Sequence, residues 1–518
     1  MSLLSATFIL LTMVVLAPSL ALAKTVVMFP APLGSYFIYH SNIGQALADL
    51  GHDVWICVPH YLINKGLIKS KDLNILIYGE KLGHFEQNFF EKIQFVDAFW
   101  EDRSIFINVM QTFPDAIQLF KNVTETVLSD NKFVDKIHDL NPDLFILDGF
   151  MFLRNLLVLP YKLDLPFAMI GTLHEMVFTR VPFSPAVEPF VPTDFTNKMT
   201  FLQRVQNVFI TLGFSLFDSI VDYDVVTRFA PEKPYKSILD ISLTAQIYIA
   251  ELDYILDYPR PTLPNTKLIG GSSASEAKPL LGELNEFVEN STRGVVVVSF
   301  GSMDVKIPDA ILLKMVQAFQ LLDLSVVWKV NLNVADPRNI KISRWLPQND
   351  LLGHAKTRVF VSHCGKNGQY EALYHAVPIV CLPIFFDQHY NTNRIIIKGF
   401  GLGGDLRKIT SQEFADLINE VAYNPKYKTN IRKGSELFKE LYKVPNKEAA
   451  YWFDHVIKYG GDYMRSSGQE MPLYQFLLLD VMAFLIGFLF GVFLLICVVI
   501  KLLFKCICKT NQTKSKGD

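Results

Sequence analysis

Cysteine is scarce in this 518-residue sequence, and its opposite charges nearly cancel. Neither His363-Cys364 nor Cys506-x-Cys508 has the paired spacing of a zinc site. We therefore exclude a disulfide-rich scaffold and expect thiols that are buried or lie near a membrane. Lys and Arg number 49 against 51 Asp and Glu, a net charge of -2, so nothing favours binding to nucleic acid. The cysteines are Cys57, Cys364, Cys381, Cys497, Cys506 and Cys508.

Long runs without charge are rare, and the two clearest lie at the ends of the chain. Residues 1–23 predict a secretory signal peptide, because the run from Leu3 to Leu16 is mostly apolar. Ala21-Leu22-Ala23 then supplies a small-residue cleavage site. A retained helical anchor is the alternative interpretation of this segment.

The second run, residues 481–500, contains no charged residue. As a helix its twenty residues span ~30 Å, the thickness of a bilayer core. Five lysines follow in the tail, residues 501–518, so the positive-inside rule places this tail in the cytosol. We predict a single-pass type I membrane protein in which residues 24 to about 475 lie outside the cytosol.

Short motifs are consistent with that orientation. Asn122-Val-Thr124 and Asn290-Ser-Thr292 are glycosylation sequons on the outer side, whereas Asn511 in the tail is expected to stay unmodified. The last five residues, Lys514-Ser-Lys516-Gly-Asp518, resemble the dilysine signal that returns membrane proteins to the endoplasmic reticulum. An ordinary lysine-rich flank is the alternative. We expect a protein of the endoplasmic reticulum membrane with luminal domains.

Apolar runs typical of strands alternate with helical patterns in two parts of the chain. Lys24–Pro30 and Asp53–Pro59 flank a helical pattern, and the same rhythm restarts at Gly294–Phe300. Such alternation predicts parallel, doubly wound sheets. Proline and glycine gather from Tyr258 to Ser275, which is the best linker candidate. We therefore predict an α/β protein with two Rossmann-like domains, residues 24–265 and 266–470, facing each other across a cleft.

The most informative stretch is residues 345–391, where a strand ends at Ser362 and a glycine-containing loop leads into a helix. Glycines let backbone N–H groups approach an anion, and the start of a helix favours negative charge. His363 and Asn367 add side-chain donors, and Glu371 lies one helical turn further on, where a carboxylate can bind both ribose hydroxyls.

Three further features complete a nucleotide-sugar site. Asp387-Gln388 follows the next strand, at the sheet edge where ligands bind, and offers bidentate contacts to sugar hydroxyls. Trp345 offers a flat face for a base, and Gln348 offers an amide. Each residue alone is more often structural, but the ordered set is hard to obtain by accident.

Residues 345–391 resemble the signature of the UDP-glycosyltransferases, in particular the animal UDP-glucuronosyltransferases. The resemblance extends to the signal peptide, the Tyr258-Pro-Arg-Pro linker, Ser299-Phe-Gly-Ser302 and the C-terminal anchor. It implies the GT-B fold, in which the N-terminal domain takes the acceptor and the C-terminal domain takes the UDP-sugar. The donor-binding residues it implies are Ser299, Ser302, Trp345, Gln348, His363, Gly365, Asn367, Gly368, Glu371, Asp387, Gln388 and, as a glucuronate contact, Arg260.

The sequence departs from the family pattern at two positions. Cys364 stands in the middle of the phosphate loop, where a small side chain fits. Tyr36 stands where the family has the histidine that acts as general base, while Asp148 matches the carboxylate that orients this base. A phenol, with a reference pKa of ~10, is poorly matched to this task. His40 one turn further on, or Asp148 acting directly, is the alternative base.

The implied reaction is an inverting transfer of a hexosyl group, most simply glucuronosyl, from a UDP-sugar to a small lipophilic acceptor. No metal or other cofactor is expected, because the diphosphate is already a good leaving group and is stabilised by His363, the loop amides and the start of the helix. Asp222-Tyr-Asp224 is a D-x-D string of the kind that some metal-dependent glycosyltransferases use, but it lies in a helical part of the acceptor half, where a solvated helix face is the better interpretation. The alternative function is a weakened UDP-sugar-binding or partner subunit, associating with itself or with related transferases. Sequence leaves open the acceptor, the choice among glucuronate, glucose and galactose, and the oligomeric state.

Overall fold

The computed structural model divides into two units, residues 1–465 and 466–518, which are described separately. It describes residues 23–514 except for 69, 84–99, 101–104, 173–178, 183, 192, 222–223, 302–306 and 332–338. The expected signal peptide, residues 1–23, lies outside the described residues apart from its last position, as do Asp222 and Ser302.

The first sheet of the larger unit contains only parallel pairs among the described strands, in the order β3-β2-β1-β4-β5-β6-β7. Its strands are β1 Thr25–Phe29, β2 Asp53–Pro59, β3 Asn74–Tyr78, β4 Leu144–Asp148, β5 Phe167–Gly171, β6 Tyr248–Ala250 and β7 Thr266–Leu268. Its helices are α2 Gly34–Asp49, α5 Ile105–Leu128, α6 Asn131–Leu140, α7 Val158–Lys162, α9 Phe201–Val221, α10 Val225–Phe229 and α11 Ile238–Ser242. Short 3₁₀ turns are η1 His60–Lys65, η2 Glu80–Leu82 and η3 Met151–Leu157.

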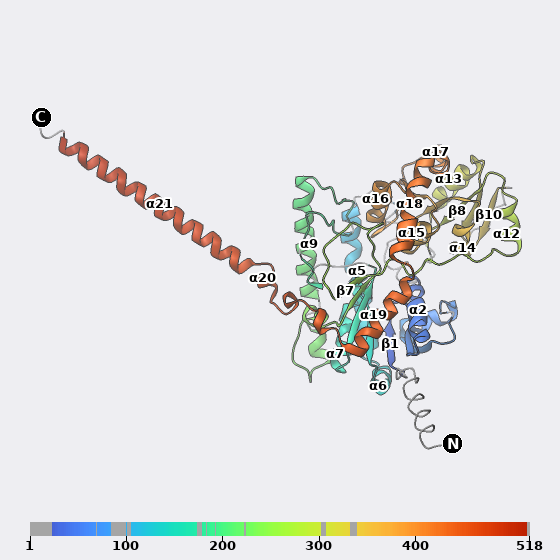
Figure 1. Cartoon of the computed structure of the whole chain (residues 1–518), viewed down its shortest axis with the longest axis horizontal. Helices are drawn as coiled ribbons and strands as arrows, with labels where there is room; N and C mark the ends of the chain where they lie inside the picture. The colour runs from blue at the N-terminus through green and yellow to red at the C-terminus, as the bar shows by residue number, and fades with distance from the viewer. Residues whose placement is uncertain are drawn as a thin grey trace, which may run out of the picture. The chain divides into compact units, whose positions relative to one another are not determined.

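The second sheet is also parallel, in the order β10-β9-β8-β11-β12-β13. Its strands β8 and β10 are labelled in Figure 1. Its strands are β8 Val295–Ser299, β9 Ser325–Lys329, β10 Ile340–Ser343, β11 Thr357–Ser362, β12 Ile379–Cys381 and β13 Gly401–Gly403. The helices that follow β7 are α12 Gly282–Glu289, α13 Asp309–Gln320, α14 Gln348–Gly353, α15 Lys366–Tyr374, α16 Gln388–Lys398, α17 Ser411–Tyr423, α18 Pro425–Leu441 and α19 Pro445–Tyr459, before the turn η4 Asp462–Met464.

In each sheet the strand that comes first in the sequence lies near the middle. The order in which later strands are added changes side next to it, as in doubly wound folds. The central strands are apolar on both faces, as in residues 295–298, which are four fully buried valines. Ligands of such sheets bind beyond the carboxyl ends of the strands at the point of reversal. The ends of β1 and β4 in one sheet, and of β8 and β11 in the other, are therefore where a site is expected.

The structure differs in detail from the expected domain boundary at residue 265. The first sheet continues to Leu268, because β7 follows the proline-rich segment in the sequence and still pairs with β6. The chain also returns to the first sheet near its end. Helix α19 packs on α2, where Ala449 and Phe453 share a core with Ile43 and Leu47. The division into an acceptor domain and a donor domain remains a proposal.

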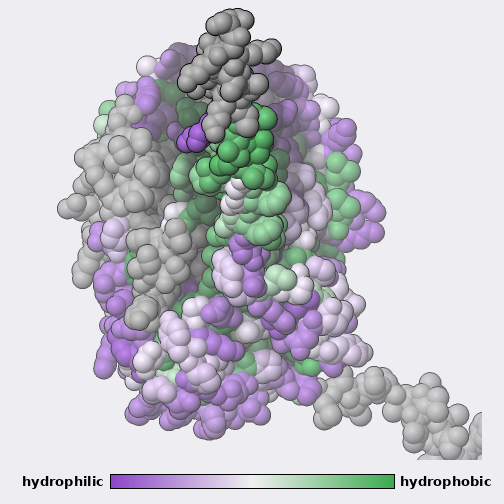
Figure 2. All heavy atoms as spheres, turned by 90° about the vertical axis from the view of Figure 1, so that its left-hand side faces the viewer, coloured by the Kyte–Doolittle hydropathy of each residue, from purple (hydrophilic) through white to green (hydrophobic). Residues whose placement is uncertain are grey.

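The smaller unit contains η5 Ser467–Gln469, α20 Leu473–Phe476 and the long helix α21 Leu479–Lys514. Within α21, residues 479–505 are long and apolar enough to cross a membrane, and none of the most apolar stretch is buried. Figure 2 shows this hydrophobic surface as a continuous green stretch, in contrast to the mainly hydrophilic surface of the larger unit on this face. Since water does not favour so large an apolar surface, the helix is suited to anchoring the chain in a bilayer.

Candidate active site

His363 occupies a narrow place in the loop between β11 and α15. The imidazole ring lies between Gly301 and Gly365, and a Cβ atom at either glycine would overlap it. At Gly301 the backbone φ of +93° also favours glycine. Burial, helped by the charge of Lys329, lowers the pKa of His363 to about 4. The side chain is therefore a neutral hydrogen-bonding group near pH 7, held at the start of a helix that favours an anion.

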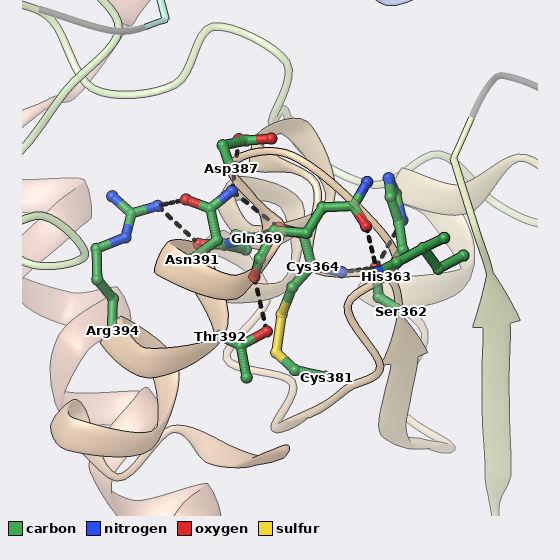
Figure 3. The surroundings of a disulfide bond; sticks show 11 residues. Ser362, His363, Cys364, Gln369, Cys381, Asp387, Asn391, Thr392 and Arg394 are labelled. Carbon is green, nitrogen blue, oxygen red and sulfur yellow. Dashed lines mark hydrogen bonds between the residues drawn. A yellow bond between two sulfur atoms is a disulfide. The ribbon is translucent and has the colours of Figure 1, made fainter. Parts of the chain in front are cut away.

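A disulfide between Cys364 and Cys381 ties this loop to the end of β12 (Figure 3). Our expectation of free thiols was wrong here, because β11 and β12 are neighbouring parallel strands and bring the two Cα atoms to 5.3 Å. The backbone carbonyl of Cys364 also accepts hydrogen bonds from Gln369 Nε2 at 2.6 Å and Asn391 Nδ2 at 3.0 Å. The loop is thus fixed covalently and by hydrogen bonds. Cys57, by contrast, is a buried free thiol.

Glu371 and Gln348 meet across the nucleoside end of the site. Gln348 Nε2 donates a hydrogen bond to the Glu371 carboxylate. Burial raises the pKa of Glu371 to about 7, although this hydrogen bond opposes the shift. Trp345 stands beside them with 58% of its surface exposed, and Lys329 Nζ lies 5.0 Å from the centre of its ring. An exposed indole face next to a carboxylate is suited to a base and its ribose.

Asp387 and Gln388 lie at the start of α16. The Gln388 carboxamide oxygen accepts backbone N–H bonds from Ile384 at 2.7 Å and Phe385 at 3.0 Å. This fixes the side chain and leaves its amide nitrogen for a ligand. Asp387 accepts a hydrogen bond from Asn391 Nδ2 at 2.7 Å, and burial raises the pKa of its carboxyl group.

Asp148, at the end of β4, contacts residues other than Tyr36. Its Oδ2 accepts a hydrogen bond from the Tyr39 hydroxyl and lies 2.9 Å from His40 Nε2, while its Oδ1 accepts one from the Phe150 backbone N–H at 2.8 Å. Tyr36 instead has a hydrogen bond with the side chain of Thr172. Burial first, and then the negative charge of Asp148, hold the pKa of Tyr36 well above its usual value.

One cavity of about 500 Å³ brings these residues together. From the second sheet's half it is lined by ten of the predicted donor residues, namely Ser299, Trp345, Gln348, His363, Gly365, Asn367, Gly368, Glu371, Asp387 and Gln388. From the first sheet's half it is lined mainly by apolar and aromatic side chains, including Leu33, Tyr36, Ile38, Tyr39, Ala116, Phe150 and Phe152. A polar wall thus faces an aromatic wall, as expected for a polar donor and an apolar acceptor.

Comparison with known proteins identifies the family. The family model described as "UDP-glucoronosyl and UDP-glucosyl transferase" matches residues 25–516. The chain belongs to this family.

Several similar proteins carry related names. Human UDP-glucuronosyltransferase 2B7 is 29% identical over 93% of each chain, and human UDP-glucuronosyltransferase 1A10 is 30% identical over 88% of this chain and 87% of that one. A UDP-glucosyltransferase from Polygonum tinctorium, solved in complex with 3,4-dichloroaniline, covers 85% of this chain and 100% of its own, with a TM-score of 0.57 and 13% identity. These similarities confirm the GT-B fold with two parallel Rossmann-like sheets, and the activity class of a UDP-sugar glycosyltransferase.

Other predicted residues of this UDP-glycosyltransferase lie away from the cavity. Asp148 and His40 are fully buried behind its wall. Arg260 does not line it either, because its guanidinium is paired with the Glu188 carboxylate and donates to the Tyr390 hydroxyl at 3.1 Å. Ser302 lies outside the described residues. The glycosylation candidates Asn122 and Asn290 are both exposed, on α5 and at the end of α12, and their modification remains a prediction.

Two lysines of the cavity wall were missed from the sequence. Lys329 ends β9, and Lys366 begins α15, where its Nζ donates to the Thr172 carbonyl at 2.9 Å and to Asp257 at 3.3 Å. Burial lowers the pKa of Lys366 to about 7. The position of Lys366 inside the glycine-containing loop was a usable signal. Lys329 could have been found from the rule that ligands bind where parallel strands end.

Groups suited to a metal ion are not seen in the described part of the chain, where no three His, Cys, Asp or Glu side chains gather suitably. Asp224, the described member of the D-x-D string, is exposed and lies 3.9 Å from Arg228 one turn along. Its surroundings are those of a solvated helix end.

Proposed function

We propose that the chain is a membrane-bound inverting glycosyltransferase that moves a hexosyl group, with glucuronosyl as the first choice, from a UDP-sugar to a small lipophilic acceptor. The observation that carries the proposal is the single cavity with a polar wall from one half and an aromatic wall from the other. Trp345 and Gln348 would hold the uracil, Glu371 the ribose, and Asp387 with Gln388 the sugar. The aromatic wall would hold the acceptor.

The reaction in this site is a displacement at the anomeric carbon. The acceptor hydroxyl attacks from the aromatic side while the UDP oxygen leaves toward the loop after β11. Neutral His363, loop N–H groups and the start of α15 then stabilise the charge that develops on the diphosphate. These groups are fixed before reaction, so they need little reorganisation as the bond breaks.

The preference for glucuronate is supported by the names of similar proteins, which include UDP-glucuronosyltransferases. It is not supported by Arg260, which is engaged by Glu188. Lys366 does line the cavity, where it is partly charged near pH 7 because its pKa is lowered to about 7, and its charge acts on Asp387. A competition assay with UDP-glucuronate, UDP-glucose and UDP-galactose tests the choice, and preference for a neutral sugar would contradict it.

A second function, a UDP-sugar-binding or partner subunit with little catalysis, is favoured by one observation. Tyr36, at the position of the family's base, is a phenol whose pKa is held well above its usual range. UDP release with mixed phenols and amines separates the two functions: tight UDP-sugar binding without turnover supports the second. In that case Tyr36→His should create activity toward alcohols, and an unchanged rate would refute this explanation.

We also propose that the larger unit lies in the lumen of the endoplasmic reticulum, with residues 501–518 in the cytosol. The support is the apolar helix α21, the lysines after it and the two exposed sequons. Endoglycosidase treatment should increase mobility on a gel, and Asn122→Gln with Asn290→Gln should abolish this shift. A protease that digests the larger unit in sealed microsomes would contradict the orientation.

A further inference from the structure

The proton of the attacking hydroxyl must go to a group near the aromatic wall, which is called the acceptor wall below because it is proposed to hold the acceptor. The polar wall, proposed to hold the UDP-sugar, is likewise called the donor wall. Asp148 is a carboxylate next to the acceptor wall, but it is fully buried and does not line the cavity. His40 is equally buried. Direct proton transfer from a bound acceptor to either residue is therefore blocked by the side chains in between.

Tyr39 connects the cavity to Asp148. Tyr39 is also buried, with 1% of it exposed, but unlike Asp148 and His40 it is one of the residues that line the cavity, and its hydroxyl donates a hydrogen bond to Asp148 Oδ2. Tyr36 lines the same wall, with the two rings 5.8 Å apart, but its own hydrogen bond is with Thr172. Residues 36 and 39 are on one face of α2, since they are three positions apart in a helix. Of the two tyrosines, only Tyr39 contacts the carboxylate.

Asp148 is held in place by hydrogen bonds with three groups. Its carboxylate receives the Tyr39 hydroxyl and the Phe150 backbone N–H. His40 Nδ1 has no hydrogen-bond partner among the described residues, which favours the tautomer whose Nε2–H donates to Asp148. Of the two side chains that hydrogen-bond to this carboxyl group, only Tyr39 also lines the cavity.

Resting on the proposed function above, we propose that Tyr39 is a catalytic residue that relays the acceptor's proton to Asp148. As the acceptor oxygen bonds to the anomeric carbon, its O–H bond breaks and the proton passes to Tyr39 Oη. The phenolic proton moves at the same time to Asp148 Oδ2. The bond from the anomeric carbon to UDP breaks, and its electron pair leaves on the diphosphate oxygen. Charge and protons balance, because one carboxylate is neutralised as one diphosphate oxygen becomes anionic.

A relay is chemically different from a tyrosinate base. Burial and the charge of Asp148 hold the pKa of Tyr39 well above its usual value, so the phenol keeps a proton throughout. Such a hydroxyl can pass a proton on in a concerted step but cannot store the negative charge. In the relay, Asp148 is the final proton acceptor, and Tyr39 connects it to the cavity.

The test compares Tyr39→Phe with the wild type in the full-length, membrane-bound protein. UDP release is followed with UDP-glucuronate or UDP-glucose and with acceptors of graded acidity, from 4-nitrophenol to benzyl alcohol. We expect kcat for benzyl alcohol to fall ~10²–10⁴-fold, the usual effect of losing a general base. The fall should shrink toward 4-nitrophenol, which needs little base. Asp148→Asn should cost as much, and the double variant no more, because the two residues act as one unit.

The control is Tyr78→Phe, which removes another buried hydroxyl beside the same sheet. Tyr78 does not line the cavity, and its hydroxyl has no hydrogen-bond partner among the described residues. This variant should keep wild-type rates. UDP-glucose affinity, measured by calorimetry, should be unchanged in both variants, which separates loss of the relay from loss of the fold.

A measurement without substitutions gives an independent test. The rate in mixtures of H₂O and D₂O should fall along a curve, because two protons move in the relay, whereas one moving proton gives a straight line. A straight line, an equal loss for all acceptors in Tyr39→Phe, or an acidity-dependent loss in Tyr36→Phe alone would overturn the relay. A wild type that binds UDP-sugar but turns over no acceptor would overturn the proposed function together with the relay.

Discussion

The two walls of the cavity differ in how their residues are held. On the donor side, side chains sit on a short stretch of chain and are fixed by neighbours within it, as His363 is by Gly365 and Gln388 is by the backbone before α16. On the acceptor side, Asp148 acts with residues more than a hundred positions away in the sequence. Much of the donor wall is therefore held by contacts between residues close in the sequence, whereas the acceptor wall depends on how α2 packs against β4.

This difference predicts where substitutions have large effects. A change in the donor wall should weaken binding or chemistry for every acceptor. A change in the acceptor wall should alter rates in a way that depends on the acceptor.

His363→Ala should lower kcat ~10²–10³-fold with every acceptor, the usual cost of losing one donor that stabilises developing charge. The loss should be independent of acceptor acidity, since the imidazole serves the leaving group. Initial rates with UDP-glucose and the graded phenols provide the measurement. A loss confined to weakly acidic acceptors would mean that His363 acts on the attacking hydroxyl and not on the leaving group.

Breaking the disulfide should destabilise the donor wall. Cys364→Ser with Cys381→Ser should lower the free energy of unfolding by about 3 kcal/mol, typical for a bridge closing a loop of this size. UDP-glucose affinity should fall with it, because the loop carrying His363 loses its covalent tie. Thermal unfolding and calorimetry measure both effects, and Cys57→Ser is the matched control. A wild-type protein whose free energy of unfolding is the same with and without dithiothreitol would contradict the prediction.

The affinity for UDP-glucose should depend on the ionisation of Glu371. Its carboxylate accepts ribose hydroxyls best when charged, and its pKa is raised by burial to about 7. Affinity should therefore rise roughly tenfold from pH 6 to pH 8. The same raised pKa means that ionising Glu371 destabilises the folded state. The contribution of Glu371 to stability is greatest below its pKa in the unfolded chain, ~4.3, and falls as the pH rises toward 7.

Glu371→Gln is the variant that isolates this effect. It should remove the rise in affinity with pH. His363 contributes none in this range because its pKa is lowered to about 4, and Lys366, whose pKa is lowered to about 7, loses positive charge as the pH rises and so cannot raise the affinity for an anionic ligand. Calorimetric titrations at four pH values measure the slope. A rise in affinity with pH that survives in Glu371→Gln would assign the titration to another group.

Lys366→Met should have the smallest effect, a reduction of about tenfold or less in the use of UDP-glucuronate relative to UDP-glucose, within the range measured for single hydrogen bonds to charged groups. Its ammonium lines the cavity and also bonds to Thr172 and Asp257. Lys314→Met is the control, since that lysine bonds to the Leu406 carbonyl away from the cavity. Equal losses with both donors would mean that Lys366 only ties the chain together.

The same contrast explains what the sequence could predict. The doubly wound sheets follow from alternating apolar runs, and the donor wall follows from residues that lie close together in the chain. The disulfide could not be predicted, because it depends on β11 and β12 being neighbours. The return of α19 to α2 and the Tyr39–Asp148 contact also depend on tertiary packing, since each joins distant segments. At position 36 the family pattern points to a tyrosine that lies one turn before Tyr39, the residue that contacts Asp148.

The most direct test of the account is an experimental structure of the protein with UDP-glucose bound. We expect the uracil on the face of Trp345, the ribose hydroxyls on Glu371, the diphosphate beside His363 and the glucose near Asp387 and Gln388. A nucleotide found at any other place, with this wall left empty, would contradict the central claim that the second sheet's half binds the donor.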